Sequence, residues 1–148
     1  MAAYRAPDGP PLAAPVFLDT GTNGWWGAGR SPDGTPYRWA DTRDGKAAEL
    51  LLFNLSQERR RARVQFTVLN YEAERSVTIA INGYTADQFT LAPNGAREVT
   101  LDLDVPPGMN LLTLSSPQPP IPIPGARGVD DRLLSFAVRQ VRMQEIAR

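Results

Sequence analysis

Alternation of apolar and polar residues with a period of two recurs along this chain and restricts its fold more than any other feature. In the stretch RVQFTVLN, Val64, Phe66 and Val68 fall on one face and the residues between them are polar. The stretches SVTIAIN, residues 76–82, and EVTLDLDV, residues 98–105, repeat the pattern. Successive side chains of an extended chain point to opposite faces, so each stretch has one buried and one solvated face. This is typical of antiparallel sheet.

Turn signals separate these stretches. Asn82-Gly83 lies between two strand-like runs, and this dipeptide favours a hairpin because a type I′ turn needs positive φ at both central residues. In the final run, LLSFAVRQVRM, the alternation slips at Arg139-Gln140, which predicts a β-bulge. About eight or nine short strands in one domain predict an all-β antiparallel sandwich or jelly roll. We predict these strands over residues 15–19, 36–41, 46–55, 62–70, 75–82, 85–91, 96–104, 110–115 and 134–143.

The domain organisation follows from length and composition. A chain of 148 residues is the size of one domain. Residues 1–14 are rich in alanine, proline and glycine, so we expect a linker or extended segment there and the sandwich over residues 15–145. Such a start is typical of a domain within a longer polypeptide. No stretch approaches the roughly 20 apolar residues of a membrane span, so we expect no span in this chain.

Composition excludes several classes of function. Basic and acidic residues balance at 16 each, which argues against a nucleic-acid partner. Cysteine and histidine are absent, which removes thiolate chemistry and the commonest general base. The acidic residues fall at polar strand positions or in turns, and none stands in an apolar pocket that would raise its pKa as glycoside hydrolysis requires. We therefore expect no catalysis and no catalytic residue.

Metal binding has little support in the sequence. Carboxylates such as Asp19 and Asp41 leave a structural calcium site open, but no calcium-loop spacing is present. No cofactor is predicted.

One glycine-rich segment, residues 19–41, carries a concentration of large aromatic residues. Trp25, Trp26, Tyr37 and Trp39 fall within fifteen positions. Sugars bind by laying their C–H faces on aromatic rings while polar groups hold the hydroxyls. The alternative is that the rings are plugs of the core, and adjacent Trp25 and Trp26 would point opposite ways on a strand. The glycines predict an irregular loop whose backbone needs positive φ.

Three charged or polar features have two interpretations each. The arginine block over residues 59–63 predicts a solvated turn before a strand, with an anionic partner as the alternative. Asp130, Asp131 and Arg132 end the long connection 116–132, where they pin the loop by ion pairing or hold sugar hydroxyls. The sequence Asn54-Leu55-Ser56 is a glycosylation sequon that we interpret as coincidental.

The order of motifs over residues 16–143 resembles a known family. FLDTGTNGWWG, YRWAD and AAELLLFNL are followed by an Asn-Gly hairpin, a turn into a leucine-rich strand, and DDRLLSFAVRQVRM. This is similar to the galactose-binding-like β-sandwich domains appended to bacterial membrane glycosyltransferases and related cell-envelope proteins. The resemblance implies a non-catalytic accessory domain on the extracytoplasmic side, next to a catalytic or membrane domain of its parent chain.

The resemblance also implies a glycan or glycolipid as partner, with ligand contacts drawn from one set of residues. The expected ligand-binding residues are Trp25, Trp26, Tyr37, Arg38, Trp39, Asp131 and Arg132. The alternative function is a structural or protein-interaction module, for which we would expect buried tryptophans and an exposed apolar patch or paired edge strand.

Overall fold

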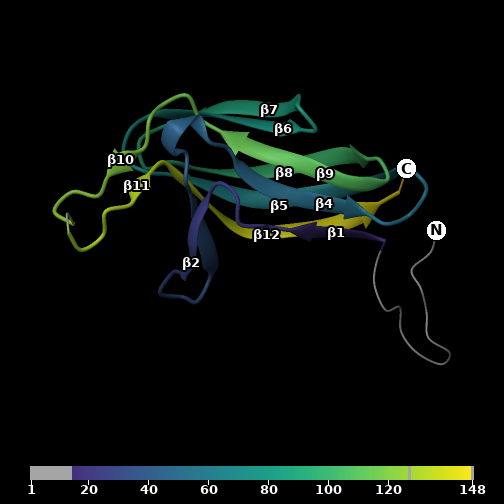
Figure 1. Ribbon diagram of the computed structural model, residues 1–148, viewed down its shortest axis with the longest axis horizontal. Helices are drawn as coiled ribbons and strands as arrows, with labels where there is room; N and C mark the ends of the chain where they lie inside the picture. The colour runs from purple at the N-terminus through teal and green to yellow at the C-terminus, as the bar shows by residue number, and fades with distance from the viewer. Residues whose placement is uncertain (1–14, 127, 148) are drawn as a thin grey trace.

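Two antiparallel sheets form the body of the protein. The computed structural model describes residues 15–126 and 128–147, and residues 1–14, where a linker is predicted, lie outside the described residues. Each of these sheets has five strands, and a third, short sheet has two (Figure 1). The predicted all-β sandwich is confirmed.

The strand bounds agree with most of the predicted segments. They are β1 (Val16–Asp19), β2 (Trp25–Arg30), β3 (Pro36–Ala40), β4 (Ala48–Asn54), β5 (Arg60–Asn70), β6 (Arg75–Ile81), β7 (Tyr84–Leu91), β8 (Ala96–Val105), β9 (Gly108–Ser115), β10 (Ile121–Pro122), β11 (Leu133–Leu134) and β12 (Phe136–Ile146), with one short 3-10 turn at Arg43–Gly45. The first sheet has the strand order β1-β4-β9-β6-β7, the second has the order β2-β3-β12-β5-β8, and the short third sheet joins β10 and β11. Within the residues described, no helix is long and apolar enough to cross a bilayer.

The core consists of the side chains that alternation predicts to point inward. Val64, Val68, Val77 and Ile79 have no exposed surface, and Ile81 packs against them half-buried. Burying one such aliphatic side chain stabilises a fold by about 1.5–3 kcal/mol. The two sheets are therefore held together by the apolar faces that the sequence pattern marks.

The predicted Asn-Gly hairpin is present between β6 and β7. Asn82 and Gly83 have φ angles of 50° and 86°, both in the left-handed region that a type I′ turn requires. Ile81 pairs with Tyr84 across the turn.

The segment from residue 25 to residue 30, predicted as irregular loop, is instead strand β2. It pairs with β3 from Trp25–Ala40 to Arg30–Pro36. Positive φ occurs at Gly21 and Gly24 before the strand, as predicted, but not at Gly27 or Gly29 within it. Glycine lowers strand propensity, so only the pairing with β3 makes this segment extended.

The prediction of a turn at the arginine block, residues 59–63, is also wrong, because most of the block lies on a strand. Strand β5 begins at Arg60, and its arginines pair across to acidic residues of neighbouring strands. Arg63 makes two hydrogen bonds to Asp102, at 2.7 and 3.0 Å. Arg61 lies 3.7 Å from Asp104, and Arg60 lies 3.1 Å from Glu145. The chain itself thus supplies anionic partners for much of this block.

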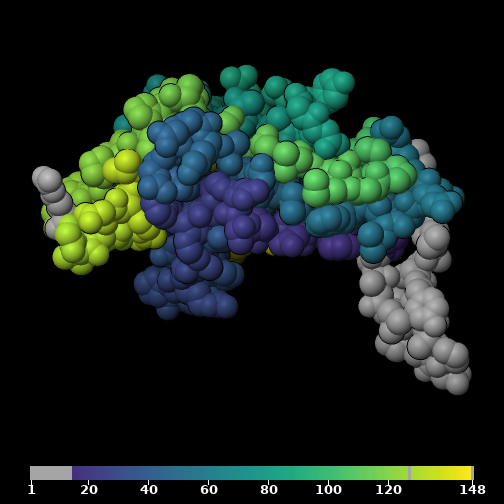
Figure 2. Space-filling model, viewed as in Figure 1, coloured from purple at the N-terminus to yellow at the C-terminus, as the bar shows by residue number. Residues whose placement is uncertain are grey.

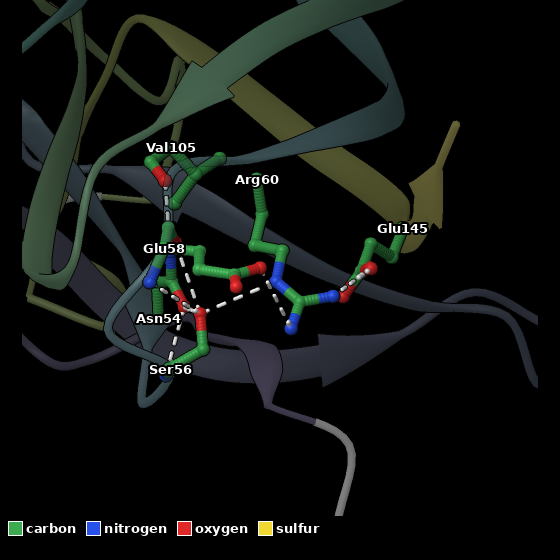
Figure 3. A network of polar contacts seen from close by, with 6 residues as sticks. All are labelled: Asn54, Ser56, Glu58, Arg60, Val105 and Glu145. Carbon is green, nitrogen blue, oxygen red and sulfur yellow. Dashed lines mark hydrogen bonds and ion pairs between the residues drawn. The ribbon is translucent and has the colours of Figure 1, made fainter. Parts of the chain in front are cut away.

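Asn54, the first residue of the sequon, is at the centre of a polar network at the end of β4 (Figure 3). The residue is 1% exposed, and its Nδ2 donates to the carbonyls of Glu58 and Val105, each at 2.8 Å. Its Oδ1 accepts from the backbone N–H and the hydroxyl of Ser56. A glycan on this amide is incompatible with the folded protein, in agreement with the interpretation of the sequon as coincidental.

The long connection after β9 is held by a buried arginine. Arg75, at the start of β6, has no exposed surface and donates to the carbonyls of Gln118 and Pro119 and to the Ser116 hydroxyl. Burial lowers the pKa of Arg75. Its contacts fix the first turn of the connection, and the pairing of β10 with β11 returns the chain to β12.

Candidate functional site

The second sheet forks where β3 leaves β12. The two strands pair only at Trp39–Ala137, Arg38–Val138 and Tyr37–Arg139. Beyond Arg139, β12 bulges at Gln140, whose φ is 56°, and its pairing with β5 resumes at Arg142. The predicted bulge is confirmed. Strands β2 and β3 continue past the fork as a hairpin that projects from the body of the molecule (Figure 1, Figure 2).

A second irregularity lies opposite, in β2. The pairing of β2 with β3 shifts between Trp25–Ala40 and Ala28–Arg38. Because of this shift, Trp25 faces the core while Trp26 sits in the bulge. Bulges re-aim side chains and often border functional sites.

Trp25 belongs to the hydrophobic core. It is 9% exposed, and its Nε1 donates to the Glu49 carbonyl at 2.8 Å. The Arg38 guanidinium lies 5.6 Å from the ring centroid. Arg38 donates to the carbonyls of Gly21, at 2.7 Å, and Trp26, at 3.3 and 3.1 Å. These two side chains thus share the inner side of the second sheet.

Trp26 is half-buried and joins β2 to the long connection. Its Nε1 donates to the Leu133 carbonyl at 3.2 Å, and the Arg43 guanidinium stacks 4.3 Å from its ring centroid. Arg43 is itself held by two hydrogen bonds to the Asp41 carboxylate, each 2.8 Å long. These hydrogen bonds, more than any other cause, lower the pKa of Asp41. One face of the Trp26 ring is therefore covered by a fixed cation.

The outer face of the second sheet carries Tyr37, Trp39 and Tyr71, which we term the aromatic cluster. All three side chains are half-buried. The Trp39 ring lies 5.7 Å from Tyr71 and 6.5 Å from Tyr37, at interplanar angles of 86° and 82°. Edge-to-face contact of this kind is a favoured aromatic geometry. The indole plane is nearly perpendicular to both phenol rings, so the three do not form one flat platform.

The end of the long connection carries a charged pair. Arg132 makes hydrogen bonds to both carboxylate oxygens of Asp130, the shortest at 2.6 Å. This pairing raises the pKa of Arg132 and lowers that of Asp130. Asp131 is exposed and accepts a hydrogen bond from the Gly128 backbone. The predicted pairing among these three residues therefore joins Asp130 to Arg132.

Two polar atoms of β12 and the residue before it lack a partner within the described structure. They are the Ser135 hydroxyl and Arg139 Nε, both buried. Ser135 and Arg139 flank Ala137, the register partner of Trp39, at a spacing of two residues. By strand alternation they lie on the outer face with the aromatic cluster.

A cavity of about 240 Å³, which we term the edge pocket, lies at the fork. Its lining includes buried Trp25, Leu50 and Val138, and exposed Ala28, Pro36 and Gln140. Tyr37 also lines it and therefore borders both the edge pocket and the aromatic cluster.

The structure divides the predicted ligand residues among several places. Trp25 and Arg38 lie on the inner side at the edge pocket, whereas Tyr37 and Trp39 meet at the outer face and Arg132 pairs with Asp130 at the end of the long connection. Trp26 and Asp131 hold the frame through their bonds to the long connection. The sequence analysis did not include Tyr71 among the site residues, because no local sequence pattern indicates that it lies beside Trp39.

The described part of the chain contains no cluster of side chains that could ligate a metal ion. Within residues 15–126 and 128–147, no group of three or more acidic side chains is placed to hold an ion. Asp41, one of the carboxylates that left a calcium site open, is paired with Arg43.

Comparison with known proteins identifies structural neighbours only. No family model matches the chain, and no curated protein matches its sequence. Similar solved structures include a family 35 carbohydrate-binding module from Clostridium thermocellum, with a TM-score of 0.45, 12% identity and coverage of 88% of this chain and 92% of that one. Another is a family 35 module from Paenibacillus barcinonensis, with a TM-score of 0.43, 15% identity and coverage of 90% and 94%.

A third similar structure is a point mutant of a family 29 carbohydrate-binding module. Its TM-score is 0.43 at 12% identity, with coverage of 88% of this chain and 91% of that one. The fold assignment itself rests on the strand order of the two sheets.

Proposed function

We propose that this domain is a non-catalytic carbohydrate-binding module whose glycan site is the aromatic cluster with Arg132. The observation that carries the proposal is the arrangement of Tyr37, Trp39 and Tyr71 as half-exposed rings on the outer face of a sheet. Aromatic rings accept the apolar C–H face of a sugar, while neighbouring polar groups hold its hydroxyls.

The frame of the cluster supports this role. Tyr37 and Trp39 project from β3, which is hydrogen-bonded to β12, and the Tyr71 N–H donates to the Ser135 carbonyl at 2.9 Å. Sites carried on paired strands keep their geometry without a ligand, which lowers the entropy cost of binding.

The angle between the rings favours one class of glycan. A flat crystalline polysaccharide needs coplanar rings, whereas Trp39 stands nearly perpendicular to both tyrosines. We therefore propose a single glycan chain or terminal sugar as the ligand.

The charged side chains that we assign to the site suit hydroxyl recognition. Asp130 and Arg132 present a carboxylate and a guanidinium side by side, as acceptor and donor for vicinal hydroxyls. Arg139, the half-buried register partner of Tyr37 on β12, is a second guanidinium at the cluster.

The electrostatics support binding rather than hydrolysis. A glycosidase needs one carboxyl group whose pKa is raised so that it holds a proton. The hydrogen bond from Arg132 lowers the pKa of Asp130 instead, which keeps this carboxylate ionised.

The biological context of the proposal rests on the sequence resemblance alone. We propose that the glycan or glycolipid belongs to the cell envelope and that the domain is an accessory part of a larger glycosyltransferase-like membrane protein. The domain would then position the catalytic part on its substrate.

The test is a glycan array followed by calorimetry on the best ligand. Trp39→Ala should weaken binding about tenfold or more, because a stacked ring contributes at least about one or two kcal/mol. The matched control is Tyr84→Ala, which removes a 78% exposed ring from β7 of the other sheet and should leave binding unchanged. The proposal is contradicted if no glycan binds or if both variants bind equally.

A second candidate, a protein-interaction module, is favoured by an apolar row on the outer face of the first sheet. Phe17 pairs with Phe53 and Phe53 with Met109 in register, and the two phenylalanine rings stack at 5.0 Å. Phe17 and Met109 are 40% and 62% exposed. If this row pairs with a second copy, sedimentation should show self-association that Phe17→Glu abolishes. A monomer at all concentrations would contradict this second candidate.

A further inference from the structure

We infer that the edge pocket receives the apolar portion of an amphiphilic ligand, an alkyl or acyl chain attached to the sugar held by the aromatic cluster. This inference rests on the proposed function and specifies the ligand as a glycolipid-like molecule. Tyr37 is the shared wall, because it lines the pocket and contacts the edge of Trp39.

The first argument is the chemistry of the pocket lining. Trp25, Leu50 and Val138 form a buried apolar interior. Two polar groups of the lining are already used: Arg38 donates to the carbonyls of Gly21 and Trp26, and Trp25 Nε1 donates to Glu49. Arg139 also lines the pocket, and its Nε has no partner within the described structure. The lining as a whole is mostly apolar and favours the apolar part of an amphiphilic guest, since a fully polar guest would lose hydrogen bonds to water.

The second argument is size. An apolar cavity of roughly 150 Å³ holds a benzene molecule. The edge pocket, at about 240 Å³, has room for more than that, such as a short alkyl segment.

The third argument is that strand pairing is irregular at the edge pocket. Residues at two backbone irregularities line the pocket: Gln140 at the bulge of β12, and Trp25 and Ala28 on either side of the register shift of β2. Exposed Ala28, Pro36 and Gln140 give the pocket its mouth, and buried residues close its interior.

The test begins with a probe that has no sugar. In an NMR titration with 1-hexanol, the methyl signals of the pocket residues Leu50, Val138 and Val141 should shift in a saturable way. Leu91 and Leu103, buried in the core on the edge strands β7 and β8 at the far side of both sheets, should not shift. Absence of a selective shift of the three pocket residues would overturn the inference.

A substitution that fills the mouth of the edge pocket tests whether hexanol binds there. Ala28→Phe introduces a ring from an exposed strand position into the mouth and should abolish the hexanol response; Ala28→Leu, a smaller change, should weaken it. The matched control is Ala86→Phe on β7, also an exposed alanine on a strand, which should keep the response. Retention of the full response in folded Ala28→Phe would contradict the assignment to this pocket.

The chain-length series then tests the link between the two sites. For the sugar identified by the array, affinity should rise about threefold to fourfold for each methylene from the methyl to the hexyl glycoside. Equal affinity of all glycosides would overturn the inference while leaving the glycan site intact. If hexanol binds the pocket but no glycan on the array binds the protein, the pocket stands and the proposed function is contradicted.

Discussion

Trp39 and Tyr71 meet edge to face on the outer side of the second sheet, with ring centroids 5.7 Å apart and planes at 86°. Trp39 comes from β3 and Tyr71 follows the end of β5, and these strands are joined only through β12, which lies between them. The pair thus depends on the order of the sheet, and it defines the cluster that we propose binds glycan.

Tyr71→Ala should weaken glycan binding and lower the free energy of unfolding by about 0.5–1.5 kcal/mol, the contribution of an aromatic edge contact. Tyr71→Phe keeps the ring and is the matched control for stability. Calorimetry and urea unfolding of both variants check this. Equal binding by Tyr71→Ala and the wild type would remove Tyr71 from the site.

Gly29→Ala should weaken glycan binding through Tyr37. A Cβ at Gly29 would lie 2.9 Å from the Tyr37 ring, whereas one at Gly27 would meet nothing within 4 Å. The tyrosine ring must therefore move, at a stability cost of about 1 kcal/mol or less because it is the far end of a side chain. Gly27→Ala, in the same strand, should bind as the wild type does. Calorimetry on the pair decides, and identical affinities would show that the position of Tyr37 has no bearing on binding.

Asn54→Ala should destabilise the fold by about 2–3 kcal/mol, because buried polar groups lose their partners. The change removes the amide that donates to the carbonyls of Glu58 and Val105, and it leaves the Ser56 N–H without its acceptor. Asn23→Ala is the matched control, since that amide is exposed and donates to the Glu49 carboxylate. Chemical denaturation measures both, and a loss as small as that of Asn23→Ala would show that the network contributes little.

Stability should fall as the pH drops below about 4, in part through Asp41. The hydrogen bond from Arg43 lowers the pKa of Asp41 in the folded state. Its contribution is therefore complete above the unfolded pKa of about 3.9 and disappears as the pH falls through the lower folded value. Asp41→Asn should lower stability at neutral pH and converge with the wild type in strong acid. Asp44→Asn, an exposed carboxylate in the same turn, is the control for a general charge effect.

Local sequence predicted the features of this fold that depend on neighbouring residues. The Asn82-Gly83 hairpin follows from backbone preference, and the bulge at Arg139-Gln140 follows from a break in alternation. The inward face of β6 follows from the alternation of Val77 and Ile79 with polar residues.

Features that depend on which strands become neighbours could not be predicted in this way. Strand β2 is glycine-rich and becomes extended only by pairing with β3. For the same reason the sequence grouped Trp25, Trp26 and Trp39, whereas the sheet separates them and places Tyr71 beside Trp39. The edge pocket depends on irregularities in two strands far apart in the chain, so no local pattern marks it.

The three indole N–H signals test the central claim most directly. In a proton–nitrogen NMR spectrum, two of them come from Trp25 and Trp26, which donate to the carbonyls of Glu49 and Leu133 within the fold. On saturation with the glycan from the array, the signal assigned to Trp39 by its loss in Trp39→Phe should shift most. A larger shift of the Trp26 signal with Trp39 unmoved would contradict the aromatic cluster as the glycan site.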